Sequence, residues 1–124
     1  MTAELIIKEE IKEGVFLLHL TGDITKTSGD ELLRWRKWEE GLPEGIPCLI
    51  INFDEVQYIN SAGIAALIRL VRLGVNDRYR SGCYGLSYHY EKLFTMVGLT
   101  KYIRIFPSEW AAVDGIKLIN DEQK

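Results

Sequence analysis

A serine stands at the junction between two apolar runs of this chain. The stretch YINSAG, residues 58–63, separates CLIINF (48–53) from IAALIRLV (64–71). Apolar residues at helical spacing after the junction predict a helix, whose first turn presents unpaired backbone amides and the positive end of the peptide dipole. Ser61 or Asn60 can cap those amides, and the same amides favour a phosphate on an exposed serine. The junction therefore indicates either a structural cap or a phosphorylation site at Ser61.

The same serine could serve a second chemistry, that of a hydrolase nucleophile on a strand-to-helix turn. His19 or His89 would then be its general base. Such an elbow needs glycine two residues before the serine, and position 59 is isoleucine. The chain is also short for a hydrolase sheet. We therefore expect no enzyme and no catalytic residue.

The composition is that of one compact domain. Of its 124 residues, 47% are hydrophobic and 27% are charged, and we expect a single domain over 1–124 with its core at about 5–119. A net charge of -3 argues against nucleic-acid binding, which needs a basic surface. The amino terminus lacks a basic leader, and no segment reaches the roughly 18 apolar residues of a membrane-spanning helix. We expect a cytoplasmic protein without membrane insertion.

The two cysteines do not suggest a metal site. Cys48 and Cys83 each lie among strand-like residues and lack the close Cys or His spacing of metal ligands. Their simplest interpretation is as buried small hydrophobes rather than a disulfide pair. We expect no metal and no cofactor.

Charge is unevenly distributed along the chain. From Arg69 to Arg104 there are seven basic residues and two acidic ones, so the remainder is strongly acidic. One interpretation is ordinary solvated surface. The other is a basic face near the NSAG turn that receives an acidic partner.

Strands and helices alternate around the junction. Apolar patterning predicts strands over 5–11, 15–22, 47–53, 83–89 and 102–106, and helices over 28–42, 61–71, 90–98 and from Ser108 onward. The first two strands form a hairpin, and the consecutive apolar residues of 47–53 predict a central strand covered on both faces. Strands that alternate with helices need parallel crossovers. The predicted fold class is α/β, with a mixed, largely parallel central sheet, an N-terminal hairpin and about four helices packed on it.

The first predicted helix carries two tryptophans. Ser28, with Glu31 three residues later, predicts a capping box at its start, and Gly41 predicts its end. Trp35 and Trp38 would then lie on one helical face, either in the core or as a patch for a partner.

Longer stretches resemble the STAS family, and within it the small bacterial antagonists of anti-sigma factors. The resemblance is carried by CLIINFDEVQYINSAGIAALIRLV and GLSYHYEKLFTMVGLTKYIRIF, which cover much of the chain. Its motifs are Gly22-Asp23-Ile24 after the hairpin, Asn60-Ser61-Ala62-Gly63-Ile64 at the junction, and VGL at 97–99. Their order and intervals together are fairly specific.

This resemblance implies a switch at Ser61. In proteins of this kind the serine is phosphorylated by a partner that is both a serine kinase and an anti-sigma factor. The unphosphorylated antagonist binds that partner and frees the sigma factor, and the phosphorylated one lets go. The free antagonist is expected to be a monomer. The residues implied in partner binding are Asp23, Thr25, Asn60, Ser61, Ala62, Gly63 and Ile64.

The chain departs from the family pattern at two positions. Asn60 stands where the family usually has aspartate, and Thr25 stands where it often has an acid. Both differences remove negative charge beside the serine. The alternative function is a STAS scaffold or sensor module, not phosphorylated, within a larger signalling or transporter-associated assembly.

Overall fold

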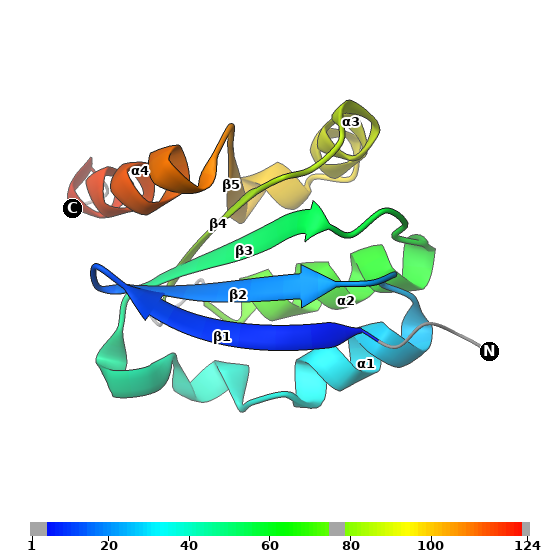
Figure 1. The fold of residues 1–124 in the computed structure, drawn as a ribbon, viewed down its shortest axis with the longest axis horizontal. Helices are drawn as coiled ribbons and strands as arrows, with labels where there is room; N and C mark the ends of the chain where they lie inside the picture. The colour runs from blue at the N-terminus through cyan, green and yellow to red at the C-terminus, as the bar shows by residue number, and fades with distance from the viewer. Residues whose placement is uncertain (1–4, 75–78, 123–124) are drawn as a thin grey trace.

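A five-stranded sheet forms the centre of the protein (Figure 1). The computed structural model describes residues 5–74 and 79–122. The strands are β1 (Ile6–Lys12), β2 (Val15–Thr21), β3 (Cys48–Glu55), β4 (Arg80–Tyr84) and β5 (Ile103–Phe106), and the helices are α1 (Lys26–Arg34), α2 (Ser61–Arg72), α3 (Tyr88–Met96) and α4 (Glu109–Glu122). Short 3-10 turns lie at Trp38–Glu40, Pro43–Gly45 and Leu99–Lys101. The strand order is β1-β2-β3-β4-β5, with β1 antiparallel to β2 and the other pairs parallel, which confirms the predicted fold class.

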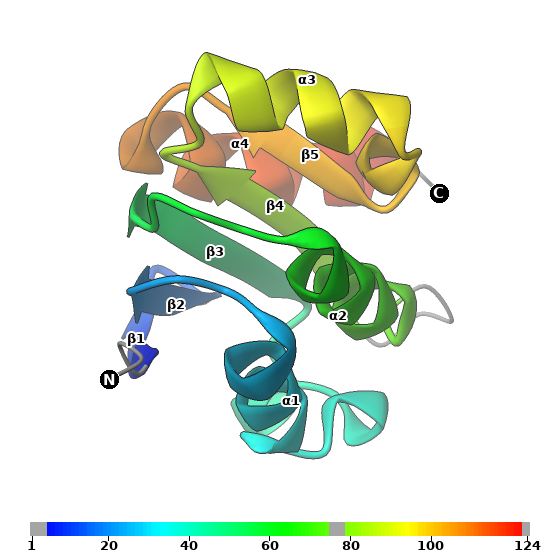
Figure 2. The same ribbon diagram turned by 90° about the vertical axis from the view of Figure 1, so that its right-hand side faces the viewer.

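Helices cover the two faces of the sheet unequally (Figure 2). Side chains of α1, α2 and α3 join the larger core cluster on one face, and α4 packs on the other. Leu49 and Ile51 of β3 belong to the first cluster, whereas Cys48 and Ile50 belong to the second. The prediction that this strand is buried on both faces is confirmed. Cys48 and Cys83 are free and buried, as predicted, and they lie on opposite faces of the sheet.

The predicted boundaries of the first helix are wrong at both ends. α1 begins at Lys26, with Thr25 as its N-cap in extended backbone, so Ser28 is the third helical residue and not the cap. At the other end, α1 stops at Arg34 because the buried Trp38 folds back and donates its Nε1–H to Leu32 O at 2.9 Å. That bond satisfies a carbonyl at the end of the helix.

The two tryptophans therefore do not share a helical face. Trp38 is 1% exposed, whereas Trp35 is 45% exposed and donates its Nε1–H to Glu9 at 2.7 Å. Trp38 is a core residue, and Trp35 lies at the edge of β1.

The predicted strand over 83–89 is also misplaced. β4 ends at Tyr84, and Gly85, with a φ of 88°, turns the chain away from the sheet. Ser87 then caps α3 by accepting the N–H of Tyr90 at 3.3 Å. The alternation of tyrosines with small residues had the period of a strand, but the turn and the cap interrupt it.

A polar cluster docks the start of α4 onto the sheet. The Glu109 carboxylate accepts hydrogen bonds from Lys12 Nζ at 2.8 Å and from the Tyr84 hydroxyl at 2.9 Å. These two bonds hold the pKa of Glu109 below its ordinary value. A carboxylate with a lowered pKa in the folded state stabilises the fold above its unfolded pKa, and that contribution is lost as the pH falls through the folded value.

We expect Glu109→Gln to remove this acid-sensitive contribution. At pH 6 the wild type should be more stable than the variant, and the difference should shrink towards about pH 3 because the wild-type carboxylate becomes protonated. Urea unfolding of both proteins at the two pH values measures it. A stability difference that does not change with pH would contradict this role of Glu109.

Candidate functional site

Asn60, not Ser61, caps α2. Asn60 has extended backbone (φ -90°, ψ -179°), and its Oδ1 accepts the N–H of Gly63 at 2.9 Å. Its own carbonyl accepts the N–H of Ile64 at 2.9 Å. Ser61 is the first helical residue and is exposed, and its hydroxyl has no hydrogen bond within the described residues. Of the two caps that the sequence allowed, the asparagine is used, and the serine hydroxyl is left free.

Two loops come together beside this serine. The segment after β2 lies along the segment that leads from β3 to α2, and a parallel bridge joins Ile24 to Ile59. Backbone hydrogen bonds connect them: Gly22 N–H to Glu55 O at 3.1 Å, Ile24 N–H to Tyr58 O at 2.9 Å, and Asn60 N–H to Ile24 O at 3.1 Å. The parallel pairing of β2 with β3 thus extends into the site. The Gly22-Asp23-Ile24 motif is thereby fixed next to the NSAG turn.

Gly63 is required by close packing rather than by a tight turn. It lies within α2, and a Cβ added to it would lie 2.2 Å from Ile24 O and 2.8 Å from the carbonyl carbon of the same residue. A second close approach follows one turn on, where a Cβ on Gly29 would lie 2.8 Å from the Cβ of Ala66. The glycine at position 63 is thus explained by a contact with the loop after β2, which the sequence alone does not show.

The predicted partner-binding residues divide into two groups. Ser61 is exposed, and Asp23, Thr25, Asn60 and Ala62 are half-buried at the same end of the sheet. Gly63 and Ile64 are buried and serve to hold the turn. The structure brings all seven together around the start of α2.

Two side chains that sequence reasoning did not assign to the site help to shape it. Ser28 is buried, and its Oγ accepts the N–H of Thr25 and donates to Asp23 O, both at 2.8 Å. The capping-box pattern, which has Glu or Gln three residues after the cap, fits Ser28 with Glu31 and so pointed to Ser28 as the cap instead. Tyr90 accepts the N–H of Ile59 at 2.9 Å from across the fold. No local pattern marks that contact.

A match to a protein-family model identifies the family of this fold. A model described as the STAS domain matches residues 7–112. The chain belongs to the STAS domain family.

Solved structures of other proteins have a similar fold at low sequence identity. An anti-sigma factor antagonist from Mycobacterium paratuberculosis has a TM-score of 0.68 and 15% identity, over 94% of this chain and 99% of that one. Phosphorylated SpoIIAA, a cell fate determinant of Bacillus, has a TM-score of 0.65 and 18% identity, over 90% and 99%. A sulfate transporter family protein from Wolinella succinogenes has a TM-score of 0.73 and 17% identity, over 90% and 92%.

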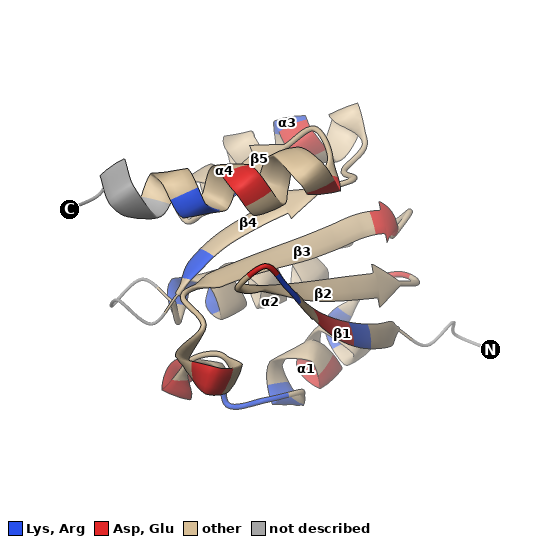
Figure 3. Cartoon of the chain, turned by 60° about the vertical axis from the view of Figure 1, so that its left-hand side comes forward, with Lys and Arg blue, Asp and Glu red and all other residues tan. Residues whose placement is uncertain are grey.

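Charges of both signs lie at the serine end of this STAS domain, where Lys26 begins α1 beside Thr25. Asp54 and Glu55 are exposed at the end of β3, whereas Arg69 and Arg72 lie in the last turn of α2 (Figure 3). Arg72 is on the order of 16 Å along the helix from Ser61. Of the two interpretations of the basic stretch, a basic face near the NSAG turn is therefore wrong for these two arginines. Arg78 and Asp77 of the basic stretch lie outside the described residues.

Neither histidine of the STAS domain is hydrogen-bonded to Ser61 in the described residues. His19 Nδ1 lies 2.9 Å from Asn52 Nδ2, and its Nε2 lies 2.8 Å from Glu10 Oε1. His89 is exposed on α3, where its ring packs edge-on against that of Tyr90 at 4.9 Å. Both ring nitrogens of His19 are thus engaged within the sheet.

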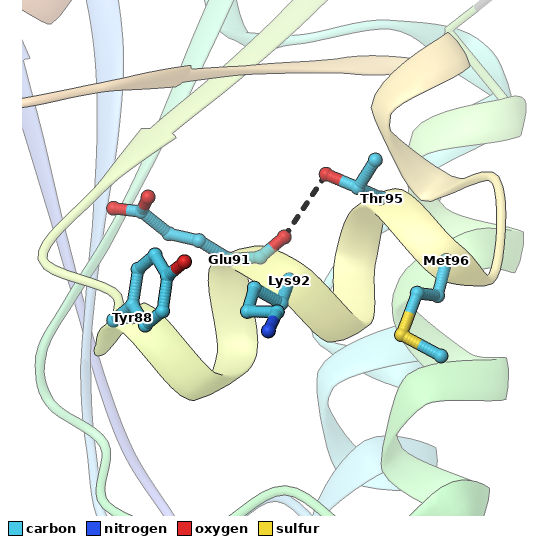
Figure 4. A pocket seen from close by; sticks show the side chains of 5 residues that line it. All are labelled: Tyr88, Glu91, Lys92, Thr95 and Met96. Atoms are coloured by element: carbon cyan, nitrogen blue, oxygen red, sulfur yellow. Dashed lines mark hydrogen bonds between the residues drawn. The ribbon is translucent and has the colours of Figure 1, made fainter.

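A hollow on the outer side of α3 does not form an enclosed ligand site. Its volume is about 290 Å³, and its lining residues, Tyr88, Glu91, Lys92, Thr95 and Met96, all come from one helix (Figure 4). No group of three or more metal-ligating side chains occurs within residues 5–74 and 79–119. No helix in the described part of this STAS domain is long and apolar enough to cross a bilayer.

Proposed function

We propose that the protein is an anti-sigma factor antagonist. It binds an anti-sigma factor that is also a serine kinase, and phosphorylation of Ser61 ends the binding. The observation that carries the proposal is the Ser61 hydroxyl, which is left free by the Asn60 cap and exposed at the first position of α2 in a STAS fold. In this proposal the free protein is a cytoplasmic monomer without a cofactor.

Phosphorylation would act through electrostatics and solvation. A phosphoserine carries a charge near -2 and three acceptor oxygens, so an interface packed around Ser61 must desolvate that charge or dissociate. Each 1.4 kcal/mol of penalty weakens binding about tenfold. In the free protein the phosphate would be stabilised at the amino end of α2, where the amides of Ser61 and Ala62 precede the first intrahelical bond. No change of fold is needed.

The neutral residue directly before Ser61 suits this switch. Asn60 keeps the cap that an aspartate would make, because its Oδ1 accepts the N–H of Gly63. It does so without a carboxylate beside the phosphate. A kinase that modifies this chain would therefore recognise the shape of the turn rather than a charge at position 60.

We expect Ser61→Ala to abolish phosphorylation. The protein is incubated with ATP and each candidate anti-sigma factor kinase from the same organism, and mass spectrometry then locates any phosphate. The wild type should carry one phosphate on Ser61, and the variant none. Ser108→Ala is a matched control, because Ser108 is also an exposed serine at a helix start, where its Oγ accepts the N–H of Ala111.

Two results would contradict the proposed switch. One is phosphate that persists in the Ser61→Ala variant. The other is a wild type that accepts no phosphate from any of these kinases, which would favour the alternative function.

That alternative is a STAS module that works without phosphorylation in a larger signalling or transporter-associated assembly. It is favoured by the TM-score of 0.73 to the Wolinella succinogenes sulfate transporter family protein, which is no lower than the 0.68 to the Mycobacterium paratuberculosis antagonist. Affinity capture from the native lysate separates the two functions. Recovery of a transporter or a multi-subunit assembly, rather than an anti-sigma factor, would support the alternative.

A further inference from the structure

The backbone just before α2 is held from two sides. On one side, Ile24 donates its N–H to Tyr58 O and accepts the N–H of Asn60. On the other side, Ile59 donates its N–H to the Tyr90 hydroxyl at 2.9 Å. This alternation follows from the extended backbone, in which the polar groups of successive residues point to opposite sides. The turn that carries Ser61 is therefore clamped between the loop after β2 and helix α3.

The α3 side of this clamp depends on a single side-chain oxygen. Ile59 is 4% exposed and Tyr90 is 8% exposed, so their hydrogen bond is shielded from water. A buried N–H that loses its partner is costly, because water cannot readily replace the acceptor. Loss of the hydroxyl would therefore force the turn to move until the amide found a new acceptor.

Tyr90 is itself held in place independently of the turn. Its N–H is capped by Ser87, and one turn later Phe94 packs edge-on against Phe53 of β3 with ring centroids 5.9 Å apart. These contacts fix α3 on the sheet. The Tyr90 hydroxyl is thus a fixed point to which the turn is attached.

We propose that Tyr90 is a positioning residue for Ser61. Its hydroxyl holds Ile59, which in turn holds the Asn60 cap and the serine beside it in the conformation that a partner meets. The effect on phosphorylation rests on the proposed function. The effect on the order of the turn does not.

Tyr79 offers a matched control, because its hydroxyl contacts the other end of α2. It is 5% exposed, and its hydroxyl donates to Leu70 O at 2.9 Å. Tyr79→Phe therefore removes a buried bond between a tyrosine and the backbone of α2, as Tyr90→Phe does for the segment before α2. Of the two substitutions, only Tyr90→Phe removes a hydrogen bond to the turn that carries Ser61.

The test compares amide hydrogen exchange of the two variants by NMR. In Tyr90→Phe, the amides of Ile59 and Asn60, which are both hydrogen-bonded in the wild type, should exchange at least about tenfold faster than in the wild type, after correction for global stability. In Tyr79→Phe they should keep their wild-type protection. Equal protection of these amides in the two variants would overturn the proposal.

A second measurement tests the consequence for Ser61. With a kinase that modifies the wild type, kcat/KM should fall several-fold for Tyr90→Phe and stay near the wild-type value for Tyr79→Phe. Faster exchange together with an unchanged kcat/KM would overturn the positioning role. If the wild type accepts no phosphate, the proposed function fails, and the exchange experiment alone decides whether Tyr90 orders the turn.

Discussion

A Ser61→Asp variant is expected to bind the anti-sigma factor at least about 100-fold more weakly, while its melting temperature stays within about 2 °C of the wild type. Binding falls because a carboxylate, like a phosphate, must be desolvated in an interface that receives a neutral hydroxyl. Stability is retained because Ser61 is exposed and an acid in the first turn of a helix is favourable to the dipole. Calorimetric titration and thermal unfolding measure the two effects.

Ser108→Asp controls for added charge at a helix start. Ser108 is exposed before α4, and aspartate is a good N-cap, so this variant should fold and bind like the wild type. The account of Ser61 would fail if the Ser61→Asp variant bound normally. It would also fail if the variant lost stability along with binding, because position 61 would then be structural.

Gly63→Ala is expected to cost about 2–4 kcal/mol of folding stability, despite the higher helix propensity of alanine. The added Cβ would lie 2.2 Å from Ile24 O, and this carbonyl is held in place by the N–H of Asn60. Backbone that is pinned in this way cannot move aside without breaking the pairing of the two loops. Urea unfolding measures the loss, and partner binding should weaken with it.

Gly115→Ala is the comparison for this prediction. A Cβ there would lie 2.4 Å from a ring atom of Phe106, which is a half-buried side chain rather than pinned backbone. A side chain shifts more readily than backbone that is hydrogen-bonded on both sides, so the loss of stability should be clearly smaller. A Gly63→Ala variant as stable as the wild type would show that the contact with Ile24 is not rigid.

Local patterns in the sequence were enough to predict the order of the elements. The consecutive apolar residues of 47–53 indicated β3, and the helical spacing that starts at Ile64 indicated α2. A strand buried on both faces has consecutive apolar residues, and a helix buried on one face has apolar residues at helical spacing. The position of Ser61 at the start of a helix follows from them.

Other features depended on contacts between distant residues. Trp38 ends α1 early by folding back onto Leu32 O, and no residue within the predicted helix signals that turn. Tyr90 reaches Ile59 from a different helix, and Gly63 is set by the close approach of Ile24. Such contacts exist only once the elements have packed, so propensity and periodicity do not contain them.

The most direct test of the switch is the affinity of the anti-sigma factor for two forms of the protein, one with serine and one with phosphoserine incorporated at position 61 during synthesis. No kinase reaction is needed, and thermal unfolding confirms that both forms are folded. We expect the serine form to bind tightly and the phosphoserine form to bind at least about 100-fold more weakly. Equal affinities of the two folded forms would contradict the claim that Ser61 controls docking.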